Sequence, residues 1–73
     1  MSKDLNILIA ITKAIRDRIA AQGVTGPKRQ ASMALEMLVG ACAVLDAVGK
    51  REEFRSVSML AFLVSTRGME GLK

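Results

Sequence analysis

Apolar residues recur at three- and four-residue spacing through the N-terminal part of the chain, the period at which side chains fall on one face of an α-helix. At roughly 100° per residue they occupy one broad arc. The members of this set are Leu5, Ile7, Leu8, Ile11, Ile15 and Ile19. Ser2 or Asp4 can cap the start of such a helix, and Gly23 stands where a glycine commonly ends one. The pattern predicts an amphipathic helix over about residues 3–22.

A second helix is predicted over about residues 27–48. Pro27 is favoured in a first helical turn, because its missing N–H would have no partner within the helix, and Gly49 marks the end. The apolar positions form two adjoining flanks, one with Met33, Met37, Val44 and Val48 and the other with Leu35, Leu38, Cys42 and Leu45. A helix with so wide an apolar surface must be covered on at least two sides, so we expect it to be central.

The third predicted helix covers about residues 50–67 and ends near Gly68. One face carries Phe54, Val57, Leu60, Ala61 and Val64. The apolar run over 57–64 could also form a short strand, but no second strand candidate is present to pair with it. We expect residues 69–73 to form a frayed tail. The fold class is therefore all-α, a three-helix protomer, with residues 1–73 forming a single small domain.

The chain is short for its hydrophobicity, with 73 residues of which 51% are apolar. A domain of this size lies near the lower limit for a self-sufficient core. Cys42 is the one cysteine and there is no histidine, so neither an internal disulfide nor a zinc site is available, and we expect no metal and no cofactor. We expect a second copy of the chain to cover the apolar surface that one copy cannot bury. A homodimer is then the simplest oligomeric helical bundle.

Self-association is expected to use apolar side chains that the protomer cannot bury. Met59, Phe62 and Leu63 point away from the core-facing side of the third helix. Met33 and Met37, one turn apart on the second helix, could line the same kind of surface or simply pack in the core.

Catalysis is not expected from this sequence. The chain lacks histidine and tyrosine, so few side chains can carry a proton at neutral pH. Glu36 and Asp46 are separated by about 15 Å along their helix, too far to act as a pair. Cys42 lies among leucines, surroundings that keep a thiol inert. We therefore predict a non-enzymatic protein.

Basic residues are the strongest candidates for binding a partner. Lys28 and Arg29 lie in the first turn of the second helix, where the helix dipole disfavours cations and free N–H groups attract an anion. The full candidate set is Arg16, Arg18, Lys28, Arg29, Lys50 and Arg51. A phosphate or a partner's carboxylate would match this arrangement; solvated charges that serve solubility are the alternative.

No membrane segment or signal peptide is expected, since the longest uncharged stretches, 56–66 and 37–45, fall short of the roughly 20 residues that a spanning helix needs. The sequence is typical of a small, basic, cytoplasmic regulator or inhibitor, with net charge +4, that self-associates and binds another protein. A dimeric nucleic-acid-binding accessory protein that uses the basic start of the second helix is an alternative. A structural subunit of a larger assembly is a further one.

Overall fold

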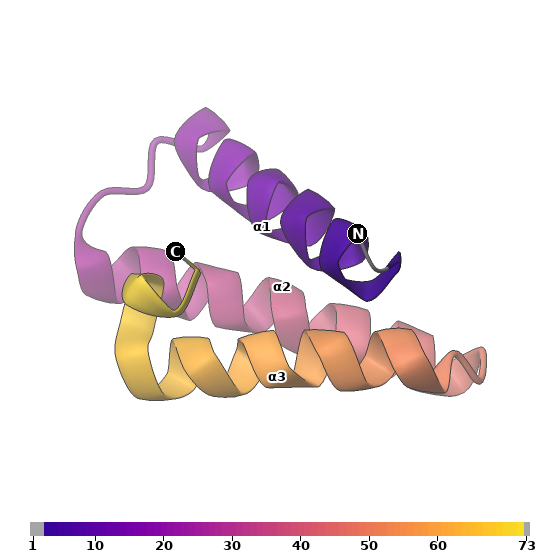
Figure 1. Ribbon diagram of the computed structural model, residues 1–73. Coiled ribbons are helices and arrows are strands. Elements are labelled where there is room, and N and C mark those ends of the chain that lie inside the picture. Colours follow the sequence, from indigo (N-terminus) through magenta and orange to yellow (C-terminus); the bar gives the residue numbers. More distant parts are fainter. Residues whose placement is uncertain (1–2, 73) are drawn as a thin grey trace.

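The computed structural model describes the backbone of residues 3–72 and the side chains of residues 6–72 (Figure 1). Three α-helices follow one another, α1 (Lys3–Ala21), α2 (Pro27–Ala47) and α3 (Arg51–Arg67), and a short 3₁₀ helix, η1 (Gly68–Leu72), follows α3 directly. Residues 3–72 contain no strand, which confirms the all-α prediction. Each observed helix end lies within one residue of the range expected from the sequence.

Glycine ends the first two helices, as the sequence predicted. After α1, Gly23 adopts φ +65° and the N–H of Val24 donates to the carbonyl of Ile19 over 3.2 Å. After α2, Gly49 adopts φ +77° and the N–H of Lys50 donates to the carbonyl of Leu45 over 2.9 Å. Both are Schellman motifs, in which a residue in the left-handed conformation turns the chain and satisfies the last helical carbonyls. These local interactions explain why the helix ends could be predicted.

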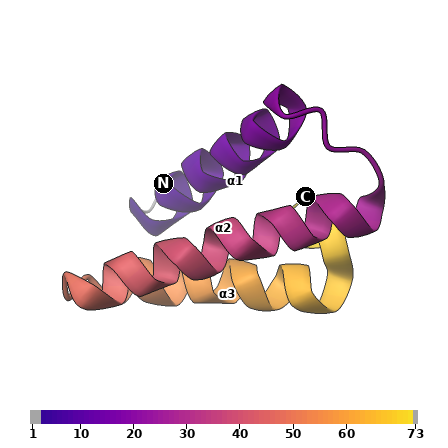
Figure 2. The ribbon, with the colours of Figure 1, turned by 180° about the vertical axis from the view of Figure 1, so that it is seen from behind.

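The helices α2 and α3 form an antiparallel hairpin, and α1 lies obliquely across one side of it (Figures 1 and 2). Two points along the hairpin show the pairing: Cys42 Sγ lies 3.6 Å from Ser58 Oγ, and a Cβ added at Gly68 would lie 4.0 Å from the Cβ of Ala31. The link between α1 and α2 is held by Gln30, whose side-chain amide donates to the carbonyl of Val24 over 3.0 Å.

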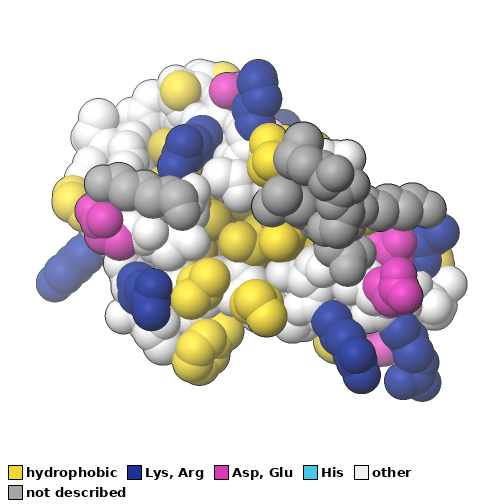
Figure 3. Space-filling model, viewed as in Figure 1, with side chains coloured by type: hydrophobic (Ala, Val, Ile, Leu, Met, Phe, Trp, Pro, Cys, Tyr) yellow, Lys and Arg dark blue, Asp and Glu magenta, His cyan; other side chains and the backbone are white. Residues whose placement is uncertain are grey.

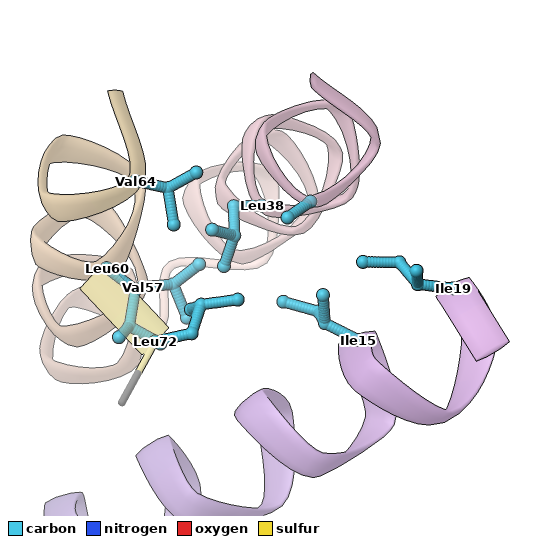
Figure 4. Close-up of a cluster of buried hydrophobic side chains, with 8 residues drawn as sticks. Ile15, Ile19, Leu38, Val57, Leu60, Val64 and Leu72 are labelled. Carbon is cyan, nitrogen blue, oxygen red and sulfur yellow. The ribbon is translucent and has the colours of Figure 1, made fainter. Parts of the chain in front are cut away.

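The core lies where α1 crosses the hairpin (Figure 4). Its buried members are Ile15, Ile19, Ala34, Leu38, Val57, Leu60, Val64 and Leu72. All four helical elements therefore contribute to one cluster, and α3 supplies its largest share. Although most residues of α2 are apolar, only Ala34 and Leu38 of this helix are buried.

The C-terminal segment differs from the expectation of a frayed tail over 69–73. Residues 68–72 form η1, and Leu72 is only 4% exposed because its side chain inserts between Ile15 of α1 and the buried side chains of α3 (Figure 4). The guanidinium of Arg16 donates to the carbonyl of Leu72 over 2.7 Å. Lys73 lies outside the described residues. A five-residue segment with one leucine shows no periodicity, so its docking depends on the tertiary fold alone.

Gly71 gives a direct test of this docking. An added Cβ there would lie 2.6 Å from the backbone carbonyl of Leu63, so Gly71→Ala must displace η1. We expect a loss of about 1–3 kcal/mol in the free energy of unfolding, measured by urea denaturation followed by circular dichroism.

The matched control is Gly40→Ala within α2, where no atom lies within 4 Å of the added Cβ. This variant should be neutral or more stable by up to about 1 kcal/mol, because alanine is the better helix former. Equal stabilities for the two variants would show that η1 is not packed against α3.

Candidate functional site

The six basic residues singled out in the sequence do not meet in one patch. Lys28 and Arg29 lie at the start of α2, whereas Lys50 and Arg51 lie after its end, at the turn into α3. A 21-residue helix is about 30 Å long, so the two pairs occupy opposite ends of the hairpin. This separation follows from the length of the helix predicted over residues 27–48, so the sequence already implied it.

The two arginines of α1 have different surroundings. Arg16 makes the hydrogen bond to the carbonyl of Leu72, so its charge is used to hold η1 against α1. Arg18 is exposed in the last turn of α1, where a cation is favoured by the helix dipole. Both arginines are exposed, but only the Arg18 side chain makes no hydrogen bond or ion pair within residues 6–72.

Lys28 and Arg29 are exposed and make no ion pair within residues 6–72. The first turn of α2 contains no acidic residue, and Gly26 offers it no side-chain cap. The two basic side chains line an open hollow of about 340 Å³ with Val24, Ser32, Met33 and Glu36. The negative charge of Glu36 in the same hollow reduces its attraction for an anion.

The residues expected to drive self-association fall into two groups. Met59 and Phe62 are 62% and 64% exposed, and hydrophobic side chains stand on the surface over α3 in the space-filling view (Figure 3). Leu63 is half-buried instead, because its backbone lies against Gly71 of η1. Met33 and Met37 are also half-buried and pack against the core. Met59 and Phe62 are thus the two of this set that are more than half exposed.

The structure also exposes hydrophobic residues that were not among the candidates for self-association. Val39 is 56% exposed and Ile9 is 53% exposed, and Val44 and Val48 on the other flank of α2 are exposed to 62% and 61%. The expectation that α2 is covered on at least two sides is therefore not met within one copy of the chain. Val39 follows the buried Leu38 and lies about 100° from it around the helix. This angle turns Val39 away from the core, so its exposure could have been predicted from the sequence.

The total accessible surface gives a measure of this incomplete covering. A folded monomer of 7.8 kDa is expected to expose about 4,400 Å². This chain exposes 5185 Å², an excess of about 800 Å². The chain alone does not bury the surface that its mass would allow.

Few other features among the described residues suggest a chemical function. No group of three or more His, Cys, Asp or Glu side chains within residues 6–72 could hold a metal ion. Cys42 is half-buried beside Ser58. The pKa of Lys13 is raised because its ammonium donates a hydrogen bond to Asp17, one turn away on the exposed side of α1. That pair is a surface interaction of an amphipathic helix.

By length and composition alone, α2 could cross a membrane. Only Ala34 and Leu38 of α2 are buried, so the helix is not a conventional core helix. Glu36 lies near the middle of α2, where a charge is costly in lipid.

Comparisons of the chain with models of protein families, with curated proteins and with solved structures gave no match. The functional interpretation therefore depends on the surfaces described above: two apolar flanks of α2, the exposed side chains of α3, and basic groups at both ends of the hairpin.

The different surroundings of the two α1 arginines predict different effects of substitution. Arg16→Ala removes the donor to the Leu72 carbonyl and should lower the free energy of unfolding by about 1 kcal/mol. Arg18→Ala is the matched control and should change it by no more than about 0.5 kcal/mol, because the exposed Arg18 side chain makes no hydrogen bond or ion pair within residues 6–72. Thermal unfolding of both variants measures the difference, and a larger effect at Arg18 would contradict it.

Proposed function

We propose that this protein is a small, non-enzymatic, cytoplasmic regulator or inhibitor that self-associates and binds another protein. The observation that carries the proposal is the set of large hydrophobic side chains that are more than half exposed. Its members are Ile9, Val39, Val44, Val48, Met59 and Phe62. Val44 and Val48 lie one turn apart on the same flank of α2, and exposed apolar residues that gather in this way commonly mark a site of protein association.

The arrangement of α2 supports two separate contacts. Val39 and Val44 are five residues apart, which places them about 140° apart around the helix. One flank can serve self-association while the other remains open to a different protein. Met33 and Met37 share the second flank with Val44 and Val48, and we refer to these four residues as the methionine flank.

The methionine flank suits a foreign protein partner. Methionine side chains are flexible and polarizable, and surfaces built from them adapt to partner helices. Here the two methionines are half-buried beside exposed valines, which gives an apolar strip along much of α2. An amphipathic helix is the kind of partner element that such a strip accommodates.

The nucleic-acid alternative is favoured by one observation, the exposed and unpaired Lys28 and Arg29 at the start of α2. A dimer would double this charge. The separation of Lys50 and Arg51 from them, and Glu36 in the same hollow, argue against a single strong phosphate-binding surface. We therefore rank this function second.

The proposal is tested by capturing partners from a cell lysate on the immobilised protein at two salt concentrations. An apolar contact persists as salt is raised, whereas phosphate binding weakens steeply. The Val44→Lys, Val48→Lys double variant should lose the captured protein, and the matched Lys28→Glu, Arg29→Glu variant should retain it.

The opposite pattern, with a nuclease-sensitive absorbance at 260 nm lost in the Lys28→Glu, Arg29→Glu variant, would place nucleic acid first. The chain has no Trp or Tyr, so that absorbance would stand out clearly. A large assembly of the purified protein that captures nothing would instead support the structural-subunit alternative.

A further inference from the structure

The hairpin of α2 and α3 is covered on one side only. Both α1 and η1 lie on the same side, and within residues 3–72 no segment lies on the other (Figures 1 and 2). Leu60 and Leu63 of α3 line a hollow together with Leu8 and Thr12 of α1, which identifies the covered side of α3. The opposite side faces solvent in a single copy of the chain.

Helical geometry shows which residues occupy the opposite side. Ser58 and Phe62 each lie about 160° around α3 from Leu60, so they are turned away from α1. Ser58 is next to Cys42, which places Cys42 on this side of α2. Leu35 and Val39 lie within about 60° of Cys42 around the helix. We call the surface made by Leu35, Val39, Cys42, Ser58 and Phe62 the uncovered hairpin side.

The uncovered hairpin side is mostly apolar. Val39 and Phe62 are 56% and 64% exposed, while Leu35 and Cys42 are partly buried at its base. A shallow hollow of about 580 Å³ borders it on α2, lined by Ser32, Leu35, Glu36, Val39 and Gly40. Projecting residues beside a hollow provide both shapes that a self-complementary contact needs.

We propose that a second copy of the chain docks on the uncovered hairpin side, so that α2 and α3 of both copies form a four-helix core. This inference rests on the self-association in the proposed function and specifies its surface. The whole chain exposes about 800 Å² more than its mass predicts, and an interface of standard size takes about 800 Å² from each partner. A dimer that buries this much on each copy would have an interface of standard size.

Charge at the turn end of the hairpin favours a second copy over an unrelated occupant. Asp46 of α2 lies about 40° from Cys42, and Arg55 of α3 lies about 60° from Ser58, so both border the uncovered hairpin side. They line the same hollow of about 410 Å³ together with Arg51 and Glu52, and neither Asp46 nor Arg55 makes an ion pair within its own copy among residues 6–72.

A two-fold axis parallel to the hairpin satisfies both charges. In this arrangement α2 of each copy lies against α3 of its partner, and the α2–α3 turns of the two copies are at the same end of the dimer. Every pair of neighbouring helices is then antiparallel, as in a four-helix bundle. Asp46 of one copy comes to face Arg55 of the other, and the symmetry repeats the pair. The charged border therefore specifies the register of an interface whose centre is apolar.

The two exposed valines of α2 provide the test. The oligomeric state of the full chain is measured by size exclusion with light scattering across the micromolar to submillimolar range. We expect a wild-type dimer, a monomeric Val39→Glu variant, and a Val44→Glu variant that remains dimeric, because Val44 lies about 160° from Cys42 around α2. Circular dichroism confirms that each variant is folded.

The charge pair gives a second, independent readout. Asp46→Arg and Arg55→Asp should each weaken dimerisation about tenfold, and the double variant that exchanges the two charges should recover most of the affinity. Recovery distinguishes a specific pair from a general effect of net charge. Additive losses in the double variant would overturn the proposed register.

The outcomes separate this inference from the function on which it rests. A dimer that survives Val39→Glu, or that is lost with Val44→Glu, overturns the interface and leaves self-association standing. A wild-type monomer over the whole concentration range removes both self-association and the interface. A dimer with the expected sensitivities that captures no other protein supports the interface and contradicts the regulatory function.

Discussion

The structure depends on one constraint: the helices carry more apolar surface than three helices can cover. The three helices of a 73-residue chain enclose one cluster, and α1 can lie on only one side of the α2–α3 hairpin. Burial of apolar surface is the main favourable term in folding, so a helix as apolar as α2 is stable only when something covers it. Because α1 covers only one side of the hairpin, few residues of α2 are buried and several of its valines are exposed. The proposed association would cover the other side.

The contact between α1 and the hairpin depends on residues that are far apart in the sequence. Leu72 fills the space beside Ile15, and Arg16 binds the carbonyl of Leu72 over 2.7 Å. The backbone of η1 approaches Leu63 so closely that only glycine fits at position 71. The short C-terminal segment thus joins α1 to α3, while the hairpin is held by its own contacts.

The helices could be predicted because their causes are local. Spacing of apolar residues, Pro27, and the Schellman glycines Gly23 and Gly49 act over a few positions, and the structure reproduces each. The docking of Leu72 and the partial burial of Leu63 could not be predicted. Each depends on which elements become neighbours, and a helical pattern shows the width of an apolar face but not its occupant.

The contact between Arg16 and Leu72 joins residues that are 56 positions apart, whereas the hairpin pairs Cys42 with Ser58 across only 16. Contacts between residues close in sequence form faster, because less chain entropy is lost in closing the loop. We therefore expect the hairpin to form first and α1 to dock last. During synthesis α1 leaves the ribosome first, and its apolar face stays uncovered until residues as far as Leu72 have followed.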